Sequence, residues 1–156
     1  WAIKNIKNIT NQHFDGDYIL LFPFCSPKLL KKKWPYFEDL VFLLNRDFGH
    51  KYNIAIAPGP KEIEESKKLN VNIILNNGKA LSISELISLI NNSVYIVSND
   101  TGPAHIASHL NKKGLVLFGS HTSAKKVSIE NSNFKALSVE NLIDLNDIIQ
   151  RRCRGS

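Results

Sequence analysis

The stretch VYIVSNDTGPAHIASHL, residues 94–110, decides how the rest of the chain is interpreted. Its first part, Val94–Val97, is a short apolar and β-branched run, which is typical of a strand buried on both faces. Pro103 then stands where the first turn of a helix tolerates proline, and Ile106 and Leu110 lie four positions apart on one side. We therefore predict a strand, a tight turn and a helix that begins near Pro103.

Asp100, Thr101 and Gly102 occupy that turn, between the carboxyl end of the strand and the amino end of the helix. In an open α/β sheet, ligands bind at such turns because free N–H groups and the positive end of the helix dipole face the crevice. Gly102 would let the chain turn and let a ligand approach the backbone closely. The alternative is that Asp100 or Thr101 caps the helix and that nothing binds.

The length of 156 residues suits one domain with a full hydrophobic core. The formal net charge of +6 favours anionic partners, such as phosphates, nucleic acid or a membrane surface, without choosing among them. There is no long uncharged apolar run, so we expect a soluble protein without a transmembrane helix or a signal peptide. Because the chain begins with Trp1 and contains no Met, we expect it to be a piece of a longer protein.

Strand and helix patterns alternate along the chain. This alternation predicts an α/β fold, in which a Rossmann-like parallel sheet of five to six strands carries helices on both faces. We expect a linker or lead-in over residues 1–17, either helical or extended, a domain over residues 18–150 and a tail over residues 151–156. The predicted strands are 18–23, 53–57, 71–75, 94–97, 115–118 and an edge strand at 134–137, and the predicted helices are 36–44, 61–69, 82–90, 103–110 and 138–149.

A lysine-rich loop follows the first predicted strand. It contains Ser26 and four lysines between Lys28 and Lys33, and it leads to Trp34, which we interpret as a packing anchor. Because it follows a parallel strand, it should lie at the same edge of the sheet as Asp100. A lysine run by itself is more typical of a solvated surface.

Carboxylates cluster at the start of the helix predicted over residues 61–69. Glu62, Glu64 and Glu65 there suit the helix dipole, which explains them without any ligand. The functional alternative is that one of them accepts hydrogen bonds from a ribose, as acidic residues after a strand do in nucleotide-binding α/β folds. Further on, Ser82-Ile83-Ser84-Glu85 predicts a capping box.

The motif Asn-Asp-Thr-Gly-Pro-x-His-x-Ala at residues 99–107, followed by Gly-Leu-Val-Leu-Phe-Gly at residues 114–119, resembles the signature of the lipopolysaccharide heptosyltransferase family. These are bacterial glycosyltransferases of the GT-B fold. The resemblance extends from Tyr18 to the final helix, and it corresponds to the carboxyl-terminal, nucleotide-sugar-binding half of such an enzyme. It therefore implies that an acceptor-binding half is missing before Trp1.

The resemblance also implies roles for individual residues around the donor diphosphate. A strand that ends in proline, then a hydroxyl residue and Lys-x-Trp-Pro, is similar to the family's diphosphate loop, which makes Lys32 the phosphate lysine and Ser26 the hydroxyl donor. Lys31 or Lys33 could substitute for Lys32. Thr101 and Gly102 would also hold the diphosphate, whereas Asp100 would position the loop or bind a sugar hydroxyl.

Other positions match the family less closely. Gly59-x-x-Glu62 resembles the corresponding turn of the family, and this resemblance implies that Glu62 binds the ribose or base. Cys25 stands where a glycine or alanine is common, and Ala80 replaces a threonine that could contact the ligand. His105 is expected either to reach the ligand or, slightly favoured, to pack in the helix. Ser120 lies in a hydroxyl-rich loop, which is either plain surface or a lid over the sugar or phosphate.

No metal or cofactor is expected, because the histidines lack partners at ligand spacing and because the resembled enzymes use no catalytic metal. The implied function is transfer of heptose from ADP-heptose to the lipopolysaccharide inner core, with the catalytic base in the missing half. The implied location is the cytoplasm, either free or in peripheral contact with the inner face of the inner membrane. Alternatives are a transferase for another nucleotide sugar and a non-catalytic nucleotide-binding module. Binding of nucleic acid is disfavoured, since no aromatic residues are interleaved with the lysines.

Overall fold

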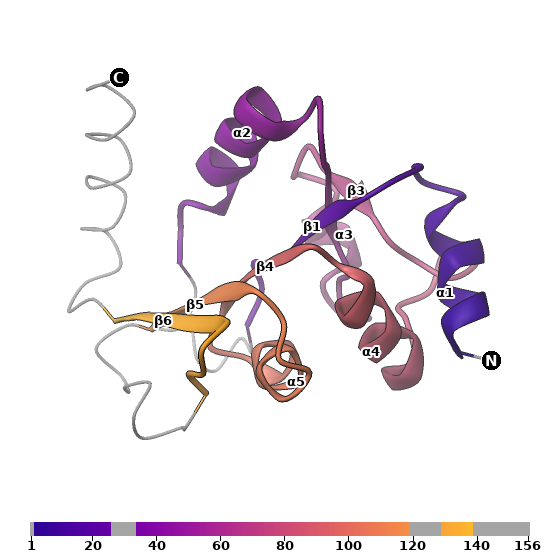
Figure 1. The fold of residues 1–156 in the computed structure, drawn as a ribbon. Helices are drawn as coiled ribbons and strands as arrows, with labels where there is room; N and C mark the ends of the chain where they lie inside the picture. The colour runs from indigo at the N-terminus through magenta and orange to yellow at the C-terminus, as the bar shows by residue number, and fades with distance from the viewer. Residues whose placement is uncertain (1, 26–33, 119–128, 139–156) are drawn as a thin grey trace.

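Six parallel strands form the centre of the molecule in the order β3-β2-β1-β4-β5-β6 (Figure 1). The computed structural model describes residues 2–25, 34–118 and 129–138. The strands are β1 (Tyr18–Phe22), β2 (Asn53–Ile56), β3 (Asn72–Ile73), β4 (Tyr95–Asn99), β5 (Gly114–Phe118) and β6 (Phe134–Ser138). The helices are α1 (Ala2–Thr10), α2 (Phe37–Phe48), α3 (Ile63–Ser66), α4 (Ile83–Asn92) and α5 (Gly102–His109).

The Rossmann-like fold predicted from the sequence is confirmed. Every strand pairs in parallel with its neighbours, and β6 lies at the edge, as expected. The chain builds the sheet outward from β1 to β3 and then returns to place β4 on the other side of β1, with Phe22 opposite Ser98. The carboxyl ends of β1 and β4 therefore lie side by side where the strand order reverses, which is where open α/β sheets bind ligands.

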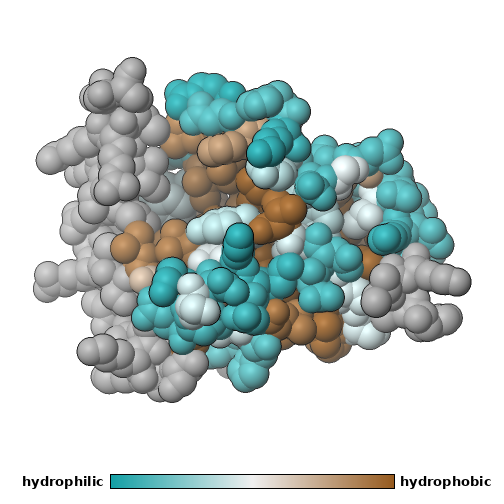
Figure 2. Space-filling model, in the orientation of Figure 1, coloured by the Kyte–Doolittle hydropathy of each residue, from teal (hydrophilic) through white to brown (hydrophobic). Residues whose placement is uncertain are grey.

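The two faces of the sheet carry separate hydrophobic cores, because successive side chains of a strand point to opposite faces. Tyr18, Leu20 and Phe22 of β1 pack on the face covered by α1, α4 and α5. Ile19 and Leu21 pack on the face covered by α2. Figure 2 shows hydrophobic residues between α2 and the strands, beneath the hydrophilic outer side of α2. Helices on both faces explain why the central strand β1 is buried along its whole length.

Several elements differ in extent from the sequence prediction. α2 continues to Phe48, four residues beyond its predicted end. The segment before β1 is helical as α1, and its Ile6 and Ile9 are buried in the core. β3 has two residues instead of five, because the edge strand pairs only with β2 and only over that length. α3 is a single turn, because residues 59–62 form a turn of their own, in which Glu62 N–H donates to the carbonyl of Gly59 at 3.0 Å.

The glycine that opens β5 is required by the close approach of its neighbours. A Cβ built on Gly114 would lie 2.6 Å from the carbonyl oxygen of Ile96 and 2.6 Å from the ring of Phe134. The first of these contacts is with backbone of the paired strand β4, which cannot move without breaking the ladder. Gly114 thus permits the spacing of three neighbouring strands.

None of the helices in the described ranges has the length and apolar character needed to cross a membrane.

We expect Tyr18→Phe to lower the free energy of unfolding by about 1 kcal/mol at neutral pH, because the buried phenol donates a hydrogen bond of 2.6 Å to the carbonyl of Leu89. Urea unfolding measures the difference. Burial raises the pKa of Tyr18, so the unfolded chain ionises first and the difference shrinks above about pH 10. Tyr95→Phe is the matched control. It removes the same hydroxyl group from a residue that is 39% exposed. An equal loss in both variants would contradict this account.

Candidate functional site

The turn after β4 is held by its own hydroxyl groups. The buried Ser98 hydroxyl donates to the carbonyl of Asn99 at 2.7 Å, and the Thr101 hydroxyl donates to the same carbonyl at 3.3 Å. Thr101 occupies the N-cap position of α5, but its side chain makes no capping hydrogen bond. The alternative in which Thr101 simply caps the helix is therefore wrong for this residue.

Asp100 is buried behind this turn, with 3% of its side chain exposed. Its Oδ1 atom lies 3.7 Å from Nε2 of His105, whose side chain is 41% exposed. His105 thus faces a carboxylate at the start of α5 and is not a fully packed core residue. The pair can fix the orientation of the imidazole relative to the turn.

Gly102 does not have the backbone conformation that would require a glycine. It is the first residue of α5, and the glycines with a positive φ in the described ranges are Gly16 and Gly78. The expectation that Gly102 lets the chain turn is therefore wrong. Among the described residues, no atom lies within 4 Å of a Cβ built at Gly102. Close approach of a ligand to this backbone stays a prediction.

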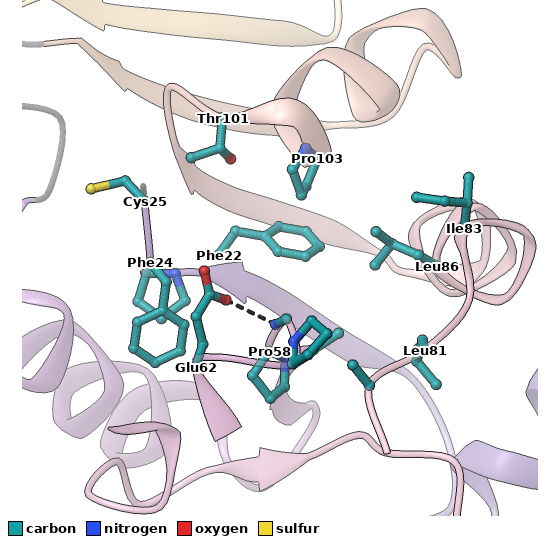
Figure 3. A pocket seen from close by; sticks show the side chains of 15 residues that line it. Phe22, Phe24, Cys25, Pro58, Glu62, Leu81, Ile83, Leu86, Thr101 and Pro103 are labelled. Carbon is teal, nitrogen blue, oxygen red and sulfur yellow. Dashed lines mark hydrogen bonds between the residues drawn. The ribbon is translucent and has the colours of Figure 1, made fainter. Parts of the chain in front are cut away.

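A pocket of about 310 Å³ opens beside this turn, at the carboxyl ends of the strands (Figure 3). Four segments far apart in the sequence form its walls: the end of β1 through Cys25, the turn after β2, the segment that leads into α4, and the start of α5. The lining residues are Phe22, Pro23, Phe24, Cys25, Ala57, Pro58, Gly59, Pro60, Glu62, Ala80, Leu81, Ile83, Leu86, Thr101 and Pro103.

The pocket has a polar end and an apolar end (Figure 3). Cys25, Glu62 and Thr101 lie toward one side, and the aliphatic side chains of Leu81, Ile83 and Leu86 lie toward the other. A mostly apolar pocket with a few convergent polar groups is the usual form of a small-molecule site. The arrangement suits an elongated ligand that is polar at one end and flat and apolar at the other.

Glu62 is the carboxylate of this pocket. Its Oε2 atom accepts a hydrogen bond of 2.8 Å from the N–H of Gly59, which closes the turn after β2. Among the described residues, Oε1 makes no hydrogen bond, and Figure 3 shows the carboxylate beside the pocket. One carboxylate oxygen thus supports the fold while the other is placed to accept hydrogen bonds from a ligand.

The residues predicted for the site separate into three groups. Thr101 and Glu62 line the pocket together, as do Cys25 and Ala80, the two positions that depart from the resembled family. Asp100, Gly102 and His105 lie next to Thr101 but do not line the pocket. Ser26, Lys32 and Ser120 lie outside the described residues, so their roles stay predictions.

Asn99 has a structural role that sequence reasoning missed. Its side chain is fully buried, and it bonds both the carbonyl of Pro23 and the N–H of Trp34. A polar residue at the end of a buried strand was the available signal, since buried amides are almost always hydrogen-bonded. The interpretation of Trp34 as a packing anchor is confirmed. The residue is 2% exposed, and its ring packs edge-on against that of Phe37 with 5.3 Å between the ring centroids.

No group of three or more metal-ligating side chains occurs in residues 2–25, 34–118 and 129–138.

Residues 4–144 match the sequence profile of glycosyltransferase family 9 (heptosyltransferase). The chain belongs to this family. The match covers most of the chain, including every wall of the pocket. No curated protein sequence matches it.

Solved structures show the same fold for this family 9 chain. Escherichia coli heptosyltransferase WaaC with ADP is similar with a TM-score of 0.70 at 18% identity, over 94% of this chain and 48% of that one. E. coli ADP-heptose lps heptosyltransferase II is similar with a TM-score of 0.74 at 18% identity, over 97% of this chain and 52% of that one. The UDP-GlcNAc 2-epimerase of Methanocaldococcus jannaschii is similar with a TM-score of 0.62 at 14% identity, over 94% of this chain and 42% of that one. The chain thus spans about half the length of these proteins.

We expect Glu62→Ala to lower the free energy of unfolding of this family 9 chain by about 1 kcal/mol, because the Gly59 N–H loses its acceptor. Glu62→Gln keeps an amide oxygen at the same place, so it should cost less. Urea unfolding of the two variants measures the difference. Equal stabilities of the two variants would show that the Glu62–Gly59 hydrogen bond contributes nothing.

Proposed function

We propose that this chain is the donor-binding half of a glycosyltransferase that transfers heptose from ADP-heptose to the lipopolysaccharide inner core. The observation that carries the proposal is the pocket at the β1–β4 switch point, whose wall includes Thr101 of the turn that matches the family's motif. Membership of family 9 supports the reaction class. The likeness to E. coli WaaC with ADP supports the choice of nucleotide.

In this proposal, the nucleoside lies along the pocket from its apolar to its polar end. The flat base packs between the aliphatic side chains of Leu81, Ile83 and Leu86, where burial of its faces supplies most of the affinity. The ribose hydroxyls donate hydrogen bonds to Oε1 of Glu62. The diphosphate then lies near Thr101, because that residue is on the polar side of the pocket.

The diphosphate carries the charge that grows when the bond to the sugar breaks. The Thr101 hydroxyl, the N–H of Gly102 at the start of α5, and the side chains of Lys32 and Ser26 stabilise it in this proposal. Fixed donors aimed at a developing negative charge are most effective where water is excluded. Asp100 repels phosphate, so it acts through the turn and His105 instead. No metal is needed in this scheme.

The acceptor and the base that removes its proton belong, in the proposal, to the other half of a GT-B enzyme. The chain spans about half of the E. coli relatives, so by itself it is expected to bind the donor without turning it over. An acceptor on lipopolysaccharide places the reaction at the cytoplasmic face of the inner membrane. The basic charge of +6 would support peripheral contact there.

A transferase for another nucleotide sugar is the second candidate. The likeness to the UDP-GlcNAc 2-epimerase of M. jannaschii favours it, because a similar fold occurs in a protein named for a uridine nucleotide. Ala80 in the pocket wall also removes a hydroxyl that the resembled enzymes present. A non-catalytic nucleotide-binding module would use the same pocket.

Calorimetric titration with ADP, UDP, GDP and CMP, with and without magnesium, tests the proposal. We expect ADP to bind tightest and without a need for magnesium. Lys32→Ala should weaken ADP binding by about tenfold or more, because a charge-assisted contact to phosphate contributes about 1.5–3 kcal/mol. Asp100→Ala should weaken it through the disturbed turn.

Lys51→Ala is the matched control. Lys51 lies against the ring of Tyr52 just before β2, at the amino ends of the strands, whereas the pocket is at their carboxyl ends. It removes the same charge and should leave ADP affinity unchanged. Preference for UDP would favour the second candidate. Failure of the wild-type chain to bind any of the four at millimolar concentration, with or without the partner half, would contradict nucleotide-sugar binding altogether.

A further inference from the structure

The side chain of Asn99 joins two segments that are far from it in sequence. Its Nδ2 atom donates a hydrogen bond of 2.9 Å to the carbonyl of Pro23, and its Oδ1 atom accepts one of 3.1 Å from the N–H of Trp34. The two partners fix the orientation of the amide, since only nitrogen can donate to a carbonyl and only oxygen can accept from an N–H. The side chain is fully buried, so both bonds are shielded from water.

The two partners stand on either side of residues 24–33 in the sequence. Pro23 follows β1 and is part of the pocket wall, together with Phe24 and Cys25. Trp34 precedes α2 and anchors it through ring contacts with Phe37. The residues between them include Ser26 and Lys32. One amide therefore determines where the end of β1 and the start of α2 lie relative to β4.

The backbone of the same residue belongs to the turn that carries Thr101. The carbonyl of Asn99 accepts the hydroxyl groups of Ser98 and Thr101. Asn99 does not itself line the pocket. Its side chain holds the wall segment at Pro23, while its backbone holds the wall segment at Thr101.

An amide at this position serves stability and geometry together. An apolar side chain of the same shape would leave the carbonyl of Pro23 and the N–H of Trp34 without this partner, which lowers stability. The amide also sets a defined geometry between three segments, because each of its two ends accepts only one kind of partner. The fully paired arrangement therefore points to a role in positioning.

We propose that Asn99 is a positioning residue for donor binding, which fixes the pocket wall at Pro23 and the start of α2 at Trp34 relative to the Thr101 turn. This inference rests on the proposed function for the identity of the ligand. It assigns Asn99 no contact with that ligand.

The test compares wild type with Asn99→Ala by calorimetry with ADP and by amide hydrogen exchange. We expect ADP to bind about tenfold more weakly or worse, and the Trp34 amide to exchange at least about tenfold faster. The amide of Ile96, which donates to the carbonyl of Lys113 in the centre of the sheet, measures global stability in the same sample. Exchange at Trp34 should rise well beyond any rise at Ile96.

Asn131→Ala is the matched control. The Asn131 side chain also joins two segments, since it donates to the carbonyl of Ser108 and accepts from the N–H groups of Asn133 and Phe134, but it does not line the pocket. Its loss should destabilise the chain without changing ADP affinity or the relative exchange at Trp34.

Asn99→Asp is a second variant of nearly the same volume, in case Asn99→Ala does not fold. It keeps the acceptor for Trp34 but, when ionised, cannot donate to Pro23. We expect Trp34 exchange, measured relative to that of Ile96, close to wild type, with weakened binding of the nucleotide. Titration with adenosine as well as ADP separates this effect from repulsion between the new carboxylate and the diphosphate.

ADP affinity of Asn99→Ala within about twofold of wild type, or Trp34 exchange that rises only in step with Ile96, would overturn the inference. Failure of wild type to bind ADP would instead count against the proposed function. The exchange comparison needs no ligand, so it would still decide whether Asn99 holds these two segments in place.

Discussion

The parallel pairing of β1 with β4 is the constraint on which the site depends. It places Phe22 opposite Ser98, so the two strands end at the same edge of the sheet. From there the chain continues to opposite faces, since α2 covers one face and α5 the other. The space between the diverging segments is where Asn99 makes its hydrogen bonds and where the pocket opens.

Most of the fold could be predicted from sequence because its strands are short apolar runs and its turns have specific chemistry. The capping box at Ser82 and Glu85 is present as expected, and Asn77 and Gly78 form a turn with positive φ. The extents of α3 and β3 could not be predicted, because they depend on nonlocal or side-chain bonds. Glu62 bonds Gly59 where the pattern alone predicts a longer helix.

The site was only partly predictable. Thr101 and Glu62 lie in the segments that follow β4 and β2, so parallel topology brought both to the carboxyl ends of the strands. The role of Asn99 depends on partners 76 and 65 positions away, which no local pattern reveals. Leu81 and Leu86 were missed as well, because aliphatic residues near a helix start have the same pattern whether they face the core or a ligand.

The walls of the pocket, which come from four distant segments, also bear on how the chain folds. Phe22 and Thr101 meet only after the crossover through α4 has placed β4 beside β1, so the pocket depends on contacts of long sequence separation. Such contacts form late and slowly, because the intervening chain must first lose its conformational freedom. A partly folded chain in which β4 has not yet paired with β1 lacks the wall that Thr101 and Pro103 supply. Closure of the pocket therefore follows the pairing of β4 with β1, and it does not require β5 or β6 to contribute a wall.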